Sequence, residues 1–219
     1  MSRRGGQQEI ARILLDRHGR TYAEEAGIRV RDTPQPLYQV LVLAILLSAR
    51  IRASVAVAAA RALFGAGMRT PRRMAEATWQ QRVDALGAGG YRRYDERTST
   101  QLGDGATLLL DRYGGDLRRM RDAADGDLDA LRRVLQEVPG LGPAGADIFL
   151  REVQHVWTEL APYLDAKAVQ GAERLGLPAD SEKLSRLVTD DDAAAFASAL
   201  VRAALDRSVV DDVLPASAK

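Results

Sequence analysis

Two stretches of helical periodicity are joined by the residues from Val138 to Ala146, which read VPGLGPAGA. Gly140 and Gly142 flank one apolar residue, Leu141, and glycine allows the positive φ and close backbone approach that a tight hairpin needs. The first N–H groups of the second helix have no acceptor within that helix, so they can point together at one phosphate oxygen. We therefore expect a hairpin that binds a nucleic-acid backbone without reading its sequence, with Leu141 packed against the two helices.

A bare Gly-x-Gly is more often a plain connection between helices. The frame from Leu135 to Ala146, with Pro139 and Pro143 around the glycines, is more specific and favours the binding hairpin. A monovalent cation held by main-chain atoms commonly completes such a site, so we expect K⁺ or Na⁺ at Val138 and Gly140 and no metal bound through side chains. The residues predicted to bind the DNA backbone are Gly140, Leu141, Gly142, Ala144 and Gly145.

The chain is predicted to be all-α. Its 219 residues are rich in Ala, Leu and Arg and contain only three Phe and two Trp, a composition that favours helices over sheets. The run from Leu37 to Ala49 is apolar on nearly every face and predicts a central buried helix. The other expected helices are 7–18, 53–64, 78–86, 92–113, 125–135, 143–157, 167–175, 181–187 and 191–205, with a short one starting at Thr70-Pro71, Ser181 and Asp190 as caps, and a frayed tail after Asp212.

Charge and composition exclude several classes of protein. Basic and acidic residues number 31 and 30, so any attraction to DNA must come from local clusters of charge. The chain has no cysteine, which excludes disulfides, thiolate zinc sites and a cysteine-ligated iron–sulfur cluster. The longest uncharged apolar run is shorter than the roughly 20 residues of a membrane span, and no secretory signal is visible. We expect a cytoplasmic, nucleoid-associated protein.

The hairpin frame resembles that of the helix-hairpin-helix (HhH-GPD) DNA glycosylase superfamily, in particular its endonuclease III-like branch. Three further segments resemble motifs of this family: Leu46-Leu47-Ser48-Ala49, Gly90-Tyr91 and Tyr163-Leu164-Asp165. The resemblance covers about 37–177 and implies a two-lobed helical glycosylase fold. Residues 1–219 would form a single glycosylase unit, with 34–135 as an approximate central lobe and 1–33 plus 143–219 as an approximate second lobe.

The resemblance implies that Asp165 is the catalytic carboxylate. From the residues alone, Asp165 is more simply the N-cap of the helix that follows, and both roles are compatible. Family members that also cleave the strand carry a lysine where this chain has Ala144, so the resemblance implies a monofunctional glycosylase that uses water. Lys167 could supply an amine, although a phosphate contact or a solvated lysine is the simpler interpretation. The family's cluster-binding cysteines are missing, so we expect no iron–sulfur cluster.

A base must leave the duplex before its glycosidic bond can be cleaved, and a side chain must fill the gap. Arg50 stands where the family carries an intercalating glutamine; a plain phosphate contact is the alternative. The residues predicted to act as a wedge or to contact phosphates are Arg50, Arg52 and Lys167, with Arg92 and Arg93 as further backbone contacts. The candidates for the base pocket are Tyr38, Ala44, Tyr91 and Tyr163, although aromatic residues at helical spacing usually belong to the core.

Three functions follow from these observations. The first is a monofunctional DNA glycosylase, without AP-lyase activity, that acts as a monomer on double-stranded DNA containing a damaged or mismatched base. The second is a catalytically inactive helix-hairpin-helix protein that only binds DNA, which Ala144 favours. The third is a helical protein-interaction domain that has no role with nucleic acids.

Overall fold

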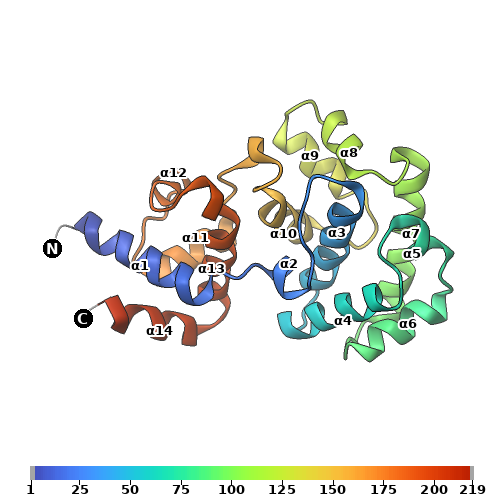
Figure 1. The fold of residues 1–219 in the computed structure, drawn as a ribbon, viewed down its shortest axis with the longest axis horizontal. Helices are drawn as coiled ribbons and strands as arrows, with labels where there is room; N and C mark the ends of the chain where they lie inside the picture. The colour runs from blue at the N-terminus through green and yellow to red at the C-terminus, as the bar shows by residue number, and fades with distance from the viewer. Residues whose placement is uncertain (1–2, 218–219) are drawn as a thin grey trace. The chain divides into compact units, whose positions relative to one another are not determined.

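A computed structural model describes residues 3–217, so residues 1, 2, 218 and 219 lie outside it. The described residues form helices joined by turns and loops, without a strand, and the predicted all-α class is confirmed (Figure 1). The chain divides into two compact units, which we call unit 1 (residues 1–22 and 150–219) and unit 2 (residues 23–149). None of the described helices combines the length and the apolar character that crossing a membrane requires.

Unit 2 is built around one buried helix. Its elements are α2 (Tyr22–Glu25, which begins at the last N-terminal residue of unit 1), α3 (Pro34–Ser48), α4 (Ala53–Gly65), α5 (Pro71–Glu76), α6 (Trp79–Ala88), α7 (Asp95–Tyr113), α8 (Leu117–Ala123), α9 (Leu128–Leu135) and the first part of α10 (Pro143–Val153). Helix α3 is buried continuously from Val40 to Leu46 and packs against α4 and α8, as its apolar sequence predicts. Helix α7 packs against α5, α6 and α8.

Local signals in the sequence set most helix boundaries of unit 2. Thr78 and Gln81 form a capping box at the start of α6, and Gly114 ends α7 in the left-handed conformation. The predicted helix 125–135 begins later, at Leu128, because Asp125 has a φ of 49° and the side chain of Asp127 caps the helix. Helix α8 was not predicted, because most of its side chains are charged.

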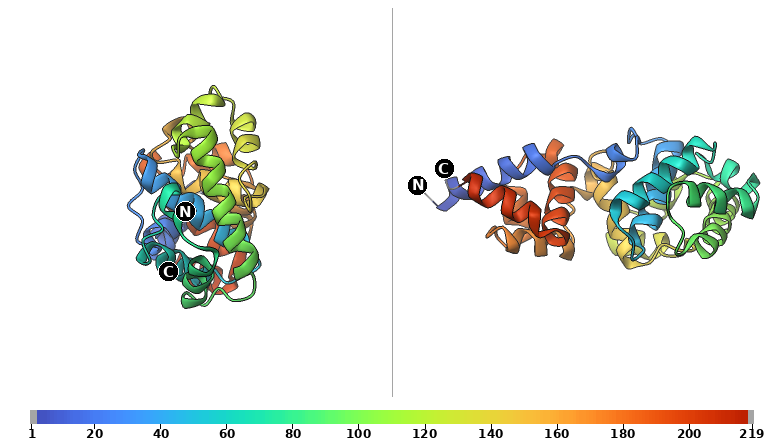
Figure 2. Two further views of the ribbon diagram at one scale, coloured as in Figure 1. Left: turned by 90° about the vertical axis from the view of Figure 1, so that its right-hand side faces the viewer. Right: turned by 90° about the horizontal axis from the view of Figure 1, so that it is seen from below.

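Unit 1 combines the two ends of the chain. Its elements are α1 (Arg3–His18), the end of α10, η1 (Thr158–Leu160), α11 (Ala166–Arg174), α12 (Ser181–Ser185), η2 (Asp190–Asp192), α13 (Ala193–Leu205) and α14 (Arg207–Ser217). Helix α13 contacts α1, α11 and α14, and α1 lies beside α14 (Figure 2). Gly171 lets α11 approach α13 closely, since a β-carbon there would overlap the carbonyl oxygen of Leu200. Leu14, Phe196 and Leu200 are fully buried in this core.

Three predictions for unit 1 were wrong. The side chain of Asp180, one residue before Ser181, caps α12, and the Ser181 hydroxyl instead donates to the carbonyl of Leu164. Asp190 begins the short helix η2 and does not cap α13. The tail is helical beyond Asp212 as far as Ser217, because Val213 is fully buried and anchors the last turns.

Candidate functional site

The predicted hairpin joins α9 to α10. Its turn is closed by a main-chain hydrogen bond from Leu141 N to Val138 O (3.0 Å), and the bond from Ala146 N to Gly142 O (3.0 Å) is the first of α10. Leu141 is 2% exposed and packs into the interior, as predicted. Gly140 has a φ of 86°, which favours glycine, whereas Gly142 lies outside the left-handed region. Only one of the two glycines is therefore required by backbone conformation.

The hairpin glycines differ in their surroundings. A β-carbon at Gly140 would lie 3.0 Å from Oε1 of Gln101, and one at Gly145 would lie 2.8 Å from Cδ1 of Leu141 and 3.5 Å from Cβ of Ser48. These two glycines allow the hairpin to pack closely against α7 and the end of α3. Gly142 has nothing within 4 Å of a β-carbon position, so the N-terminus of α10 is open on this side. Its Ala144 is exposed as well.

An ion pair fixes the two hairpin helices to each other. Arg132 of α9 and Asp147 of α10 approach to 2.9 Å, and both side chains are partly buried. Asp147 is thus a charge that pairs the two helices. The pairing stabilises the angle at which the open N-terminus of α10 is held.

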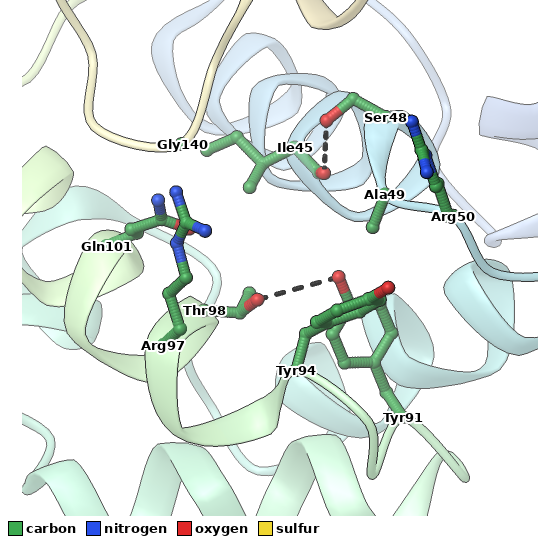
Figure 3. A pocket seen from close by; sticks show the side chains of 10 residues that line it. All are labelled: Ile45, Ser48, Ala49, Arg50, Tyr91, Tyr94, Arg97, Thr98, Gln101 and Gly140. Atoms are coloured by element: carbon green, nitrogen blue, oxygen red, sulfur yellow. Dashed lines mark hydrogen bonds between the residues drawn. The ribbon is translucent and has the colours of Figure 1, made fainter.

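A pocket of about 280 Å³ lies beside the hairpin in unit 2 (Figure 3). We call it the hairpin pocket, and it is lined by Ile45, Ser48, Ala49, Arg50, Tyr91, Tyr94, Arg97, Thr98, Gln101 and Gly140. The lining therefore combines the Leu46–Ala49 motif, the Gly90-Tyr91 turn and the hairpin, which are far apart in the sequence. The fold brings three of the four segments that carried the resemblance to one place.

The hairpin pocket is electropositive. Arg50 and Arg97 line it, and no carboxylate does. Arg50, Arg52, Arg92, Arg93 and Arg97 are all exposed, and within residues 3–217 none of them forms an ion pair. The guanidinium of Arg93 lies over the ring of Tyr94, 5.2 Å from its centroid. Clustered arginines without acidic partners attract a polyanion even though the net charge of the chain is close to zero.

The predicted base-pocket residues lie in different places. Tyr91 lines the hairpin pocket, although it is only 1% exposed, and Thr98 Oγ1 donates a long hydrogen bond (3.5 Å) to its hydroxyl. Burial raises the pKa of the Tyr91 hydroxyl further above neutral pH. Tyr38 and Ala44 are buried in the core of unit 2 and do not line this pocket. Tyr163 belongs to unit 1 and is also buried.

Asp165 is the N-cap of α11. Its Oδ1 accepts the N–H of Ala168 (3.1 Å), which confirms the capping role. Its Oδ2 accepts a hydrogen bond from Nη1 of Arg151 at 2.6 Å, in an ion pair whose side chains are 8% and 5% exposed, respectively. Both carboxylate oxygens therefore have fixed partners, which pin the side chain in one orientation.

The last turns of α10 differ from the sequence prediction. The helix predicted over 143–157 ends at Val153, and its charged residues Arg151 and Glu152 are only 4% and 2% exposed. Their charges are accommodated by partners from distant segments, since Arg151 pairs with Asp165 and Glu152 accepts a hydrogen bond from Ser198. Charged side chains are therefore buried where α10 enters unit 1.

Gln154 holds the main chain just before Asp165. Its side-chain amide donates to the carbonyl of Tyr163 (3.2 Å) and accepts from the N–H of Tyr163 (2.8 Å). The segment Tyr163–Asp165 is thereby anchored at two points, to Arg151 in the last turn of α10 and to Gln154 directly after the helix. Lys167, two residues further, is exposed and donates to Oε1 of Gln170 (2.8 Å).

Sequence reasoning missed several residues of these two regions. Arg97 and Gln101, four residues apart, lie on the face of α7 that lines the hairpin pocket, six and ten residues after Tyr91 of the Gly90-Tyr91 motif. That spacing was a signal that could have identified them. Arg151 and Gln154 carried no such signal, because polar residues on a helix usually face solvent.

Comparisons with known proteins identify the fold. No protein-family model matches the chain, and no curated protein matches it either. Among solved structures, the chain is similar to an endonuclease III trapped as a covalent intermediate with DNA, in an estranged-adenine complex (TM-score 0.50, 19% identity, 89% of this chain and 84% of that one). It is also similar to a non-covalent endonuclease III–DNA complex (TM-score 0.51, 17% identity, with the same coverage). Across most of its length, this chain has the fold of endonuclease III.

Proposed function

We propose that this protein is a base-excision-repair DNA glycosylase that hydrolyses the N-glycosidic bond of a damaged or mismatched base in duplex DNA. One observation carries the proposal: Gly140 of the hairpin lines the same pocket as the unpaired Arg50 and Arg97. The similar endonuclease III structures are complexes with DNA, which supports the same class of ligand here. Such a substrate would place the protein, acting as a monomer, at the nucleoid.

The hairpin would bind the DNA backbone. The N–H groups of Ala144 and Gly145 lie in the first turn of α10, where helix geometry leaves them without acceptors, and the helix dipole favours an anion there. Arg50 and Arg52 would add contacts to neighbouring phosphates. The Val138 carbonyl accepts one hydrogen bond, from Leu141, and so has a lone pair free for K⁺ or Na⁺, together with main-chain atoms of Gly140.

The hairpin pocket would face the disturbed base pair. Arg50 is exposed at the end of α3, where its planar guanidinium could stack on a base and donate hydrogen bonds into the gap left by an extruded nucleotide. Tyr94 offers an aromatic face at the same pocket, and Tyr91 has a protonated hydroxyl that can donate. The buried Tyr38 and Ala44 are not part of this proposal.

Asp165 would supply the carboxylate. Departure of a base creates positive charge on the sugar, and a fixed carboxylate stabilises that charge and orients the attacking water. Capping of α11 and the pair with Arg151 keep the side chain in place without reorganisation. Ala144 has no amine, so this position cannot form an imine with the sugar, and Lys167 would serve as a phosphate contact. We therefore propose a monofunctional reaction.

The test is a screen of duplexes that each contain one lesion, followed by heat or alkali to cleave abasic sites. The wild-type protein should release the damaged base from at least one of these duplexes. Asp165→Asn should bind the same duplex but should not release the base. Borohydride should trap no covalent complex. Release by Asp165→Asn at the wild-type rate would contradict the catalytic assignment, provided that the variant is folded at the assay temperature.

DNA binding can be tested separately at Ala144. Ala144→Glu places a carboxylate at the start of α10, which the helix dipole favours, so the fold should be kept while phosphate is repelled. Duplex affinity should fall by about tenfold or more, whereas the neutral control Ala144→Gln should bind within about threefold of the wild type. Equal affinity of all three proteins would remove the hairpin from the interface.

The second candidate is a DNA-binding protein without glycosylase activity. The neutral Ala144 and the engagement of both Asp165 oxygens favour it. Salt-dependent duplex binding with no release from any lesion would establish this alternative. Absence of duplex binding at low salt would instead support a protein-interaction domain.

A further inference from the structure

Unit 2 has a second electropositive pocket, at the other end of α3. It has a volume of about 450 Å³ and lies where the loop after α2 meets the start of α3 and the end of α4. We call it the arginine pocket, and it is lined by Ala26, Gly27, Arg29, Arg31, Gln35, Pro36, Gln39, Arg61, Phe64, Gly65 and Arg69. The lining contains four arginines and two glutamines and no carboxylate.

The four arginines have no acidic partners. Arg29, Arg31, Arg61 and Arg69 are exposed, and within the described part of the chain none of them forms an ion pair. Nε of Arg69 donates to the carbonyl of Phe64 (2.8 Å), which orients that side chain. Like charges gathered in one pocket repel each other, and a bound anion would remove this cost.

Other arginines of unit 2 show that pairing is common where an acid is near. Arg112 pairs with Glu137, Arg118 with Asp116 and Arg121 with Asp32. Asp32 is especially informative because it follows Arg31 in the sequence. Its carboxylate bonds with Arg121 of α8 and does not line the arginine pocket.

The start of α3 adds a second, independent feature. Thr33 is the N-cap of this 15-residue helix, but its side chain makes no capping hydrogen bond. Pro34 and Pro36 have no N–H, so the N–H of Gln35 is the donor left without an intrahelical acceptor in the first turn. Gln35 and Gln39, one helical turn apart, both line the pocket. An uncapped helix N-terminus and four guanidinium groups thus converge on one space.

The arginine pocket is separate from the proposed DNA interface. Gln35 and Ser48 are 13 residues apart on α3, which corresponds to about 20 Å along the helix axis. The hairpin pocket lies at the Ser48 end and the arginine pocket at the Gln35 end. A single phosphate group bound in one pocket is therefore too far from the other pocket to contact its lining.

We propose that the arginine pocket is a second anion site, which binds a phosphate-bearing ligand. The fork of N–H donors on each guanidinium matches phosphate oxygens in pairs, and the glutamine amides can contact a sugar or base attached to the phosphate. The same chemistry is presented by a single nucleic-acid strand and by a free polyphosphate compound. The experiment below distinguishes these two sources.

Binding of two probes to the full chain is measured at low salt. Calorimetry measures binding of inorganic tripolyphosphate, and fluorescence anisotropy measures binding of a fluorescein-labelled single-stranded oligonucleotide. The double variant Arg31→Gln/Arg61→Gln removes two exposed guanidinium groups and should fold normally. It should bind the recognised probe at least about tenfold more weakly, because two charge-assisted contacts are lost. The matched control Arg186→Gln/Arg207→Gln removes the same charge from exposed residues of unit 1 and should bind as the wild type does.

The pattern of results identifies the ligand. If the double variant loses affinity for tripolyphosphate but not for the oligonucleotide, the ligand is a free polyphosphate compound. If it loses affinity for the oligonucleotide but not for tripolyphosphate, the ligand is a nucleic-acid strand. Ala144→Glu, at the distant hairpin, should leave tripolyphosphate binding unchanged. The proposal is overturned if the wild type binds neither probe, if the double variant binds both like the wild type, or if the control lowers affinity as much.

Discussion

Replacing Asp165 by Asn should destabilise unit 1, although the substitution changes one atom. Asparagine can still cap α11 through its side-chain oxygen, so the cap is retained. The ion pair is lost, and Arg151, whose side chain is 5% exposed, would then be buried without an anion. Removing one partner of a buried pair costs about 3–5 kcal/mol. Arg151→Met should cost a similar amount, because it leaves the carboxylate of Asp165 unpaired.

The double variant Arg151→Met/Asp165→Asn should be much less damaging than the sum of the two single changes. It contains no buried unpaired charge, and replacement of both partners of a buried ion pair is often close to neutral. We expect it to lie within about 2 kcal/mol of the wild type. The coupling between the two sites should therefore exceed about 3 kcal/mol.

The two tryptophans allow the measurement to be restricted to unit 1. Trp157 is fully buried in unit 1, whereas Trp79 belongs to unit 2 and is 41% exposed. In a Trp79→Phe background, urea unfolding followed by fluorescence reports on Trp157 alone. With a slope of about 2 kcal/mol per M, each single variant should lower the urea midpoint by about 2 M.

The outcome also decides how the loss of activity is interpreted. The buried ion pair between Arg151 and Asp165 would be refuted if each single variant had an unfolding free energy within about 1 kcal/mol of the wild type and the two effects added in the double variant. If the coupling is confirmed, base release by Asp165→Asn must be measured at a temperature at which unit 1 is still folded. Only then does a lost reaction report on the chemistry of the carboxylate.

Three further predictions concern other parts of the chain. Ala144→Lys would supply the amine that the endonuclease III resemblance places there, and borohydride should then trap a protein–DNA adduct on a denaturing gel; its absence would contradict the alignment of the hairpin. The hydrogen bond from Arg118 lowers the pKa of Asp116 below 3.8, so ionised Asp116 stabilises unit 2 above that pH. The wild type and Asp116→Asn should therefore differ less in unfolding free energy as the pH falls from 4 to 2. Gly171→Ala should cost about 3 kcal/mol or more in urea unfolding, because α13 leaves no room for a β-carbon, whereas Gly87→Ala, with nothing within 4 Å, should be neutral or stabilising.

The parts of the fold that sequence predicted are those governed by local rules. The apolar run around Leu43 specified a buried helix, Thr78 specified a helix start, and the glycines around Leu141 specified the hairpin. Each of these signals lies within a few residues of the structure that it determines. The same is true of the cap at Asp165.

The parts that sequence did not predict depend on partners distant along the chain. Arg82, in a helix that reads as an exposed surface, is 8% exposed and donates to the carbonyls of Ser99, Met74 and Ala77. Burial lowers its pKa, and Gly103 leaves the room that its guanidinium occupies. Nothing near Arg82 in the sequence indicates these carbonyls, since they are brought together only by the packing of α5, α6 and α7.

The assembly of unit 1 from the two ends of the chain has a consequence for synthesis. Helix α1 is synthesised before unit 2, whereas its packing partners α13 and α14 are synthesised after it. Its apolar residues, Leu14 among them, therefore stay exposed to solvent while the continuous segment 23–149 is synthesised and can already fold. Early folding of that segment would shorten the span of flexible chain that must close when α13 arrives, and so would reduce the entropy lost in joining the ends.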